Sequence, residues 1–153
     1  MPADTNILLE DTKAALLCDN STDRIKVLED ALKDLGYQTQ VAALPEDVYD
    51  MVKYNQYDVI YVNDNFGGGN TENNEVLDYI QSMQIAARRK TFVVLSGKIY
   101  TTLDHMAAFE QSVNIVINEA DISEAKAILK KSITGSYMFY KVYNEILREI
   151  GKA

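Results

Sequence analysis

Two patterns of apolar and polar positions alternate along the chain, short apolar runs and helical stripes. The strand-like segments lie at residues 14–18, 38–43, 57–62, 91–95 and 113–117. After each of them apolar residues recur every three or four positions, as in the series Ile25, Leu28, Leu32 and Leu35. That spacing indicates one face of a helix. The pattern therefore predicts a strand followed by a helix, repeated five times.

Apolar strands joined by single helices predict a parallel sheet with helices on both faces. We expect an α/β fold of three layers, a doubly wound, flavodoxin-like sheet of five parallel strands. This domain should span residues 13–134, after a linker or disordered N-terminus at 1–12. Because Gly135 interrupts the last helical stripe, residues 135–153 should form a separate C-terminal helical extension.

Composition and charge limit the classes of protein to which this chain can belong. The chain has 153 residues, enough for one ordinary domain, and its net charge is -8. Nucleic acids and anionic membranes attract basic surfaces, so we expect neither as a partner. The single cysteine, Cys18, excludes a disulfide framework and suits a reducing cytoplasm. No apolar run approaches the roughly 18–20 residues of a membrane span.

Polar side chains follow four of the predicted strands. They are Asp19 and Asn20 after the first strand, Asn63 and Asp64 after the third, Ser96 after the fourth, and Asn118 after the fifth. The carboxyl ends of parallel strands meet at one edge of the sheet, where such folds bind their ligands. We therefore expect these side chains to share one pocket.

This arrangement resembles a response-regulator receiver domain, which accepts a phosphoryl group from a histidine kinase on an aspartate. The resemblance covers residues 13–134, about four-fifths of the chain. It implies an acidic pair after the first strand that holds Mg²⁺ and an aspartate that ends the third strand. It also implies a hydroxyl after the fourth strand and a lysine after the fifth, which pairs with the phosphoryl oxygens.

The sequence departs from this pattern at three of those positions. Asp19 retains one acidic position, but Asn20 stands at the other. Asn63 occupies the place of the phosphoacceptor, and Asn118 replaces the lysine, while Ser96 keeps the hydroxyl. A carboxamide cannot form an acyl phosphate. We therefore favour a pseudo-receiver, a non-enzymatic signalling or regulatory module that binds proteins and needs no metal or other cofactor.

Two alternatives stay open. If the third strand is one residue longer, Asp64 becomes the phosphoacceptor and Asp19 a partial Mg²⁺ ligand. The chain is then an active receiver of a two-component system, with Lys98 as the only nearby replacement for the lysine. The second alternative is a flavodoxin-like domain that binds a small molecule at the strand ends. The glycine run 67–69 matches no phosphate-loop motif and predicts a flexible loop.

Aromatic and aliphatic residues concentrate near the C-terminus. Tyr137, Tyr140, Tyr143 and Ile146 recur every three residues, and with their apolar neighbours they indicate the apolar face of a further helix. Burial of this face against the domain is one interpretation. The other is an interaction surface for a homodimer or a protein partner.

Overall fold

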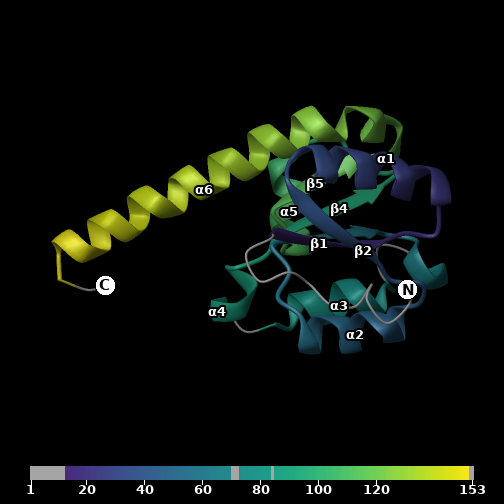
Figure 1. Ribbon diagram of the computed structural model, residues 1–153, viewed down its shortest axis with the longest axis horizontal. Coiled ribbons are helices and arrows are strands. Elements are labelled where there is room, and N and C mark those ends of the chain that lie inside the picture. Colours follow the sequence, from purple (N-terminus) through teal and green to yellow (C-terminus); the bar gives the residue numbers. More distant parts are fainter. Residues whose placement is uncertain (1–12, 70–72, 84, 152–153) are drawn as a thin grey trace.

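The computed structural model describes residues 13–69, 73–83 and 85–151, so the predicted N-terminal linker lies outside the described residues (Figure 1). Its strands are β1 (Lys13–Cys18), β2 (Tyr37–Val41), β3 (Val59–Asn63), β4 (Phe92–Gly97) and β5 (Ile115–Asn118). They form one sheet in the order β2-β1-β3-β4-β5, and every neighbouring pair is parallel. The predicted five-stranded, flavodoxin-like sheet is confirmed.

Helices cover both faces of this sheet (Figure 1). They are α1 (Thr22–Asp34), α2 (Pro45–Tyr54), α3 (Glu75–Gln81), α4 (Ile85–Arg88), α5 (His105–Gln111) and α6 (Ala125–Glu149), with 3-10 turns η2 (Phe66–Gly68) and η3 (Glu119–Glu124). None of the helices in the described ranges is both long and apolar enough to cross a membrane.

Two separate apolar cores lie on the two faces. On one face, Leu28 and Leu32 of α1 and Leu129 of α6 pack against alternate strand residues such as Val94 and Ile117. On the other face, buried residues of α2, α3 and α5 pack against the intervening strand residues; they include Val48, Leu77, Ile80, Ala108, Leu16, Val62 and Leu95. Because the central strands are buried on both faces, they read as continuous apolar runs in the sequence.

Polar side chains define where several helices begin. Ser21 accepts a hydrogen bond from the backbone N–H of Arg24 at the start of α1. Asn74 caps α3 in the same way, and Asp104 caps α5. Such caps satisfy N–H groups that have no partner within the helix.

The predicted interruption at Gly135 is wrong. The last helical stripe and the C-terminal extension form one helix, α6, of 25 residues. A single glycine weakens a helix only modestly, so the apolar periodicity on both sides of it prevails. The first half of α6 packs on the domain, and its second half projects away from it (Figure 1).

Candidate functional site

The carboxyl ends of three central strands bring three of the six predicted pocket residues together. Asn63, the last residue of β3, pairs in register with Ser96 of β4. Asp19 directly follows β1, and all three side chains are buried, with exposed fractions of 4% or less. The geometry thus places these three residues at one site.

Arg24 supplies a positive charge at this site. It lies in the first turn of α1, and its Nε and Nη2 each donate to one carboxylate oxygen of Asp19 at 2.8 Å. Such a two-pronged contact is the strongest arrangement that an arginine makes with a carboxylate. Its remaining nitrogen Nη1 donates to Glu119 Oε1 at 3.1 Å. Arg24 therefore links the ends of β1 and β5.

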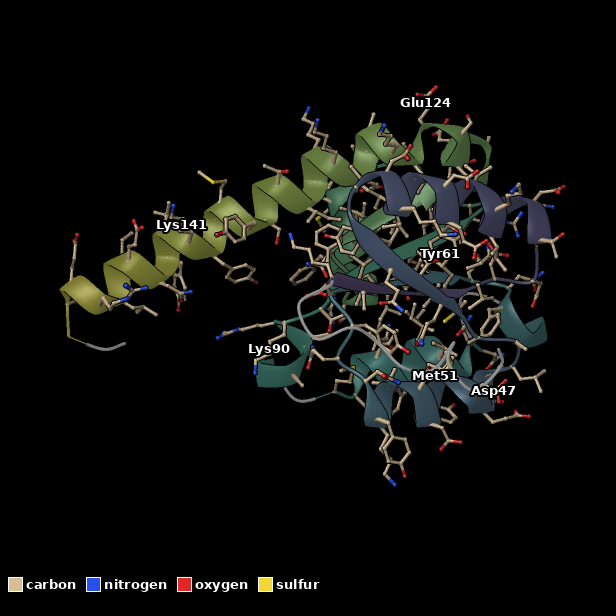
Figure 2. The ribbon with its side chains drawn as sticks, viewed as in Figure 1. Asp47, Met51, Tyr61, Lys90, Glu124 and Lys141 are labelled. Carbon is tan, nitrogen blue, oxygen red and sulfur yellow. The ribbon has the colours of Figure 1, made fainter. Side chains whose placement is uncertain are left out.

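Tyr61, which is labelled in Figure 2, forms the buried connection between Asp19 and Ser96. Its hydroxyl donates to Asp19 Oδ2 at 2.6 Å and lies 2.6 Å from Ser96 Oγ. A phenol has one proton to donate. Because that proton points to the carboxylate, Ser96 must donate its own proton to the oxygen of Tyr61.

Asn63 closes the network into a ring. Its Nδ2 donates one hydrogen to Ser96 Oγ and the other to Glu119 Oε2, both at 2.9 Å. Its Oδ1 accepts from the backbone N–H of Asn65 at 3.0 Å. A carboxylate in place of this amide could make neither of the two donations. The strand-end ring runs through six side chains and returns to the first: Arg24, Asp19, Tyr61, Ser96, Asn63 and Glu119.

Electrostatics fix the protonation state of two members of the ring, Tyr61 and Arg24. Burial raises the pKa of the Tyr61 phenol, and the charge of Asp19 raises it further. The hydrogen bond to Asp19 likewise raises the pKa of the Arg24 guanidinium. Tyr61 is therefore a neutral donor and Arg24 a cation at neutral pH.

Asp64 directly follows Asn63, and its side chain lies against Gly97. Its backbone N–H donates to the carbonyl of Ser96 at 2.9 Å, which extends the pairing of β3 and β4 by one bond. A Cβ on Gly97 would clash with the carboxylate of Asp64. The carboxylate thus packs over the glycine that follows Ser96, and a larger residue at position 97 would displace it.

Asn20 and Asn118 are not members of the ring, and their side chains form hydrogen bonds with the backbone of neighbouring loops. Asn20 donates to the carbonyl of Asn65 at 2.6 Å and accepts from the N–H of Gly67 at 3.1 Å. Asn118 donates to the carbonyls of Lys98 and Tyr100. The expectation that Asn118 fills the pocket beside Asn63 therefore needs correction, because its amide faces the segment that follows β4.

The carboxylate oxygens of the ring already accept hydrogen bonds and offer few free ligands to a divalent cation. Both carboxylate oxygens of Asp19 accept from Arg24, and those of Glu119 accept from Arg24 and Asn63. Within residues 13–69, 73–83 and 85–151, no three histidine, cysteine or acidic side chains come together as metal ligands. Mg²⁺ prefers several free carboxylate or water oxygens. The residues present do not fit such an ion, and the Lys98 side chain is exposed.

Cys18 and the glycine run 67–69 lie outside the strand-end ring. Cys18 is fully buried, and burial raises the pKa of its thiol, so it is a core residue. The glycine run forms the 3-10 turn η2, with positive φ at Gly67 and Gly68. A Cβ on Gly67 would clash with the Pro45 ring, so close packing against α2 requires glycine there.

The C-terminal candidates are exposed. The exposed fractions are 65% for Tyr137, 37% for Tyr140, 42% for Tyr143 and 51% for Ile146. The interpretation that this face is buried against the domain is therefore wrong for one copy of the chain. A contiguous group of exposed apolar and aromatic side chains is typical of interaction sites.

The prediction of the site from the sequence omits three members of the ring. Tyr61 lies in an apolar strand, although a buried tyrosine usually needs a partner for its hydroxyl. Side chains alternate along a strand, so Tyr61 and Asn63 share a face, and this signal is present in the sequence. Arg24 offers a signal as well, because a cation in the first turn of a helix opposes the helix dipole. Glu119 gives a weaker signal, because all that marks it is its position directly after Asn118, the residue at the place of the lysine that the receiver resemblance implies.

By sequence, the chain matches no protein-family model and no curated protein. By structure, it is similar to an orphan response regulator of H. pylori, with 18% identity and a TM-score of 0.60 over 81% of this chain and 98% of that one. A response regulator from Thermotoga maritima gives 17% identity and a TM-score of 0.62, over 80% of this chain and 98% of that one. This chain has the receiver fold.

A third neighbour, the chemotaxis response regulator CheY4 of Vibrio cholerae, is 14% identical, with a TM-score of 0.61 over 82% of this chain and 98% of that one. At such identities the likeness concerns the fold alone. In this fold the strand-end ring, which includes Asp19, Asn63 and Ser96, lies at the edge of the sheet where doubly wound folds bind ligands. What the ring does chemically has to be argued from its own side chains.

Proposed function

We propose that this domain is a pseudo-receiver, a non-enzymatic module of a bacterial cytoplasmic signalling pathway that works by binding proteins. It would neither accept a phosphoryl group nor require Mg²⁺. The receiver fold and the bacterial origin of its structural neighbours support the signalling context. The single observation that carries the proposal is the position and bonding of Asn63.

Asn63 has the wrong chemistry for a phosphoacceptor. Acyl phosphate formation requires a carboxylate oxygen as the nucleophile, and the carboxamide nitrogen here donates both its hydrogens, to Ser96 and Glu119. An arriving phosphoryl group would also face the carboxylate of Glu119, which repels it. A phosphoryl group in transfer needs cations to neutralise it. The one cation in the ring, Arg24, is already paired with two carboxylates.

The bonding of Ser96 supports the same conclusion. In receivers, the hydroxyl after the fourth strand answers phosphorylation by forming a new hydrogen bond, as the resemblance implies. Here Ser96 accepts from Asn63 and, because the Tyr61 proton points to Asp19, donates to Tyr61. Its hydroxyl is thus committed on both sides. The ring therefore favours one fixed conformation at the strand ends. Such a domain would act through its binding surface and not through a switch at this site.

Incubation with acetyl phosphate and Mg²⁺ tests this proposal directly. Intact-mass spectrometry at neutral pH should show no phosphoryl adduct on the wild-type chain. The matched control is Asp64→Asn, which removes the one acidic side chain next to Asn63 in the sequence. An adduct on the wild type that Asp64→Asn abolishes would show an active receiver phosphorylated at Asp64 and would overturn the proposal.

A further inference from the structure

The projecting half of α6 carries an apolar stripe at coiled-coil spacing. Phe139, Tyr143 and Ile146 of α6 and Ile150, its C-cap residue, follow one another at intervals of four, three and four residues. This alternation keeps side chains on one side of a helix and defines the seam of a coiled coil. We call these four residues the α6 seam. By the same helical geometry, the charged residues of this half all lie outside the seam; they are Lys141, Glu145, Arg148 and Glu149.

The α6 seam has no partner within the described chain that covers it. The exposed fractions of its members are 64% for Phe139, 42% for Tyr143, 51% for Ile146 and 57% for Ile150. Its aromatic rings stack on each other and meet a neighbour on the same helix: Phe139 lies parallel to Tyr143 and contacts Tyr140 edge-on. A helical segment of this length is marginal in water unless its apolar face packs on something.

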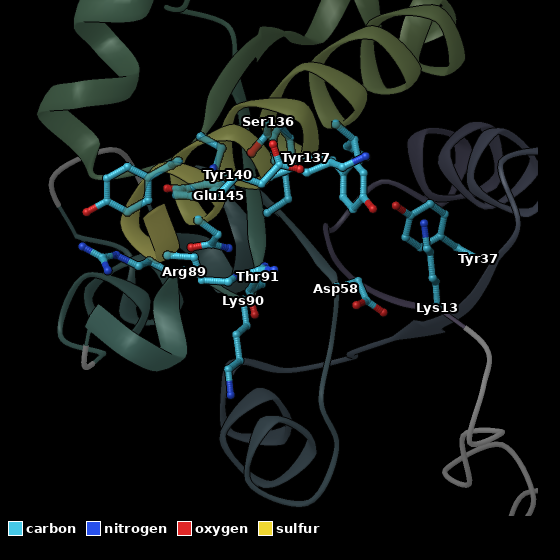
Figure 3. Close-up of a pocket in the computed structure, with 17 residues that line it drawn as sticks. Lys13, Tyr37, Asp58, Arg89, Lys90, Thr91, Ser136, Tyr137, Tyr140 and Glu145 are labelled. Carbon is cyan, nitrogen blue, oxygen red and sulfur yellow. The ribbon is translucent and has the colours of Figure 1, made fainter. Parts of the chain in front are cut away.

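An open groove separates this half of α6 from the domain. Its volume is about 810 Å³, and Figure 3 shows Tyr137 and Tyr140 on one side of it, with Lys13 and Lys90 across from them. The groove shows that the domain itself does not close over the projecting helix. The seam beside it is therefore available to a second molecule.

We infer that two copies of this chain associate through their α6 seams as an antiparallel helix pair. The inference rests on the proposed function, because it names the partner of the proposed interaction module as a second copy. The exposed area is that of a modest interface. Phe139 and Tyr143, aromatic side chains of roughly 150–250 Å² each and about half exposed, contribute about 200 Å² per copy, and the half-exposed Ile146 and Ile150 add to it. The seam is therefore smaller than the roughly 800 Å² per partner of a standard interface, so we expect the association to depend on concentration.

Side-chain size favours the antiparallel orientation. In that orientation Phe139 meets Ile150 of the second copy, and Tyr143 meets its Ile146, so each layer combines one aromatic and one aliphatic side chain. In a parallel pair each residue faces the same residue of the second copy. Two layers then contain two aromatic rings each, from Phe139 and from Tyr143, and the other two layers contain only isoleucine. Even layers pack without cavities, and uneven layers do not.

Charge favours the same orientation. Residues 1–120 carry 9 basic and 19 acidic side chains, whereas residues 121–153 carry 6 and 4. A parallel pair would bring two acidic domains side by side, and an antiparallel pair places them at opposite ends of the paired helices. The seam itself has no charged residue. Repulsion therefore opposes only the parallel arrangement.

Sedimentation velocity on the full chain over a range of concentrations tests the association. We expect a species of twice the mass of one chain, and we expect Ile146→Glu to weaken its formation by at least about 30-fold, as at a central interface residue. Met138→Glu is the matched control, because Met138 has the same exposed fraction as Ile146, 51%. It also lies about 100° around the helix from Phe139, outside the seam. Met138→Glu should leave the association unchanged.

A mixing experiment tests the orientation. Tyr143→Lys and Ile146→Glu should each weaken self-association, because each puts a charge into both central layers. Mixed together, they should form a heterodimer, since the antiparallel pair opposes the introduced lysine of one variant to the introduced glutamate of the other. In a parallel pair these two positions fall in different layers, each opposite an uncharged residue, so mixing would relieve only the repulsion between like charges and the mixed pair should stay much weaker than the wild-type dimer. Far-UV circular dichroism of each variant checks that the domain is folded.

Each outcome decides the inference. A wild-type chain that is monomeric at all concentrations, or a dimer that persists in Ile146→Glu, overturns the α6 pair. A dimer whose two variants fail to combine overturns the antiparallel orientation. None of these results depends on the strand-end ring, so they leave the pseudo-receiver proposal standing. Phosphorylation at Asp64 would overturn that proposal and leave the helix pair standing.

Discussion

Asn63→Asp restores the residue type that the receiver resemblance expects at this position, and we expect it to destabilise the domain. Asn63 is fully buried, and its amide donates to Ser96 Oγ and Glu119 Oε2 at 2.9 Å each. A carboxylate can donate to neither. The substitution therefore removes two hydrogen bonds and places a negative charge against the carboxylate of Glu119.

The size of the effect follows from these losses. Each hydrogen bond contributes about 0.5–1.5 kcal/mol to the free energy of unfolding. Leaving a buried charge without its partner costs about 3–5 kcal/mol in well-buried pairs. Glu119 and Arg24 keep side-chain exposures of 14% and 25%, so water screens part of the repulsion. We expect Asn63→Asp to lower the free energy of unfolding by about 2–4 kcal/mol at pH 7.

The destabilisation should depend on pH. When the aspartate introduced at position 63 is protonated, it is neutral and again has one hydrogen to donate. The folded variant then holds a proton that the unfolded chain has already released above its ordinary carboxyl pKa of about 4. The variant therefore loses stability as the pH rises from about 4, by up to about 1.4 kcal/mol per pH unit. Below pH 4 its deficit relative to the wild type should be smallest.

Urea unfolding followed by far-UV circular dichroism measures this deficit at pH 7 and pH 4. The double variant Asn63→Asp, Glu119→Gln is the matched control, because a glutamine at position 119 can donate to the introduced carboxylate while its oxygen accepts from Arg24. It keeps the net charge of the ring and should recover about half of the lost stability or more. If Asn63→Asp is as stable as the wild type at pH 7, the hydrogen-bond assignment of the ring is refuted.

Three further outcomes test neighbouring parts of the account. Arg24→Ala should lower the free energy of unfolding by about 2–3 kcal/mol, because it leaves the buried Asp19 carboxylate without its cation. Mg²⁺ should recover part of that loss and leave the melting temperature of the wild type unchanged. If Mg²⁺ does not stabilise the variant, Arg24 does not occupy the place where a metal ion could pair with Asp19. Burial raises the pKa of Tyr61, so the unfolded phenol ionises first, and stability present below pH 10 should decline above it. In urea titrations the stability of Tyr61→Phe should fall less between pH 10 and 12 than that of the wild type. An equal fall in stability would contradict the donor role of this hydroxyl. Gly135→Ala should raise the free energy of unfolding by about 0.5–1 kcal/mol in thermal melts, because a Cβ there meets nothing within 4 Å; a loss of stability would indicate a break in α6.

The sequence predicts the sheet because its strands are buried on both faces. Segments such as 92–95 have no polar position, and a parallel sheet covered on both faces demands this. The helical stripes are equally clear, as in Leu28 and Leu32 of α1. The expected break at Gly135 fails because a glycine ends a helix when its backbone adopts a positive φ, and Gly135 stays helical.

The strand ends could be predicted as a site, but the bonds within it could not. Asn63 and Ser96 meet because their strands are in register, which the order of strand and helix units implies. The connection from Arg24 to Glu119 joins residues 95 positions apart and depends on how α1 and β5 sit at the same edge. Local patterns carry no information on such a contact. The chemistry of Asn63 follows from its amide, whereas its two acceptors emerge only from the packed structure.

The central claim is that the strand-end ring neither binds Mg²⁺ nor accepts a phosphoryl group. Amide NMR during titration with Mg²⁺ and then with beryllofluoride, a mimic of the aspartyl phosphate, tests it most directly. We expect the signals of Asp19, Asn63, Asp64 and Ser96 to stay unchanged in both titrations. Signals of these residues that shift and saturate would contradict the claim and show a working phosphorylation switch.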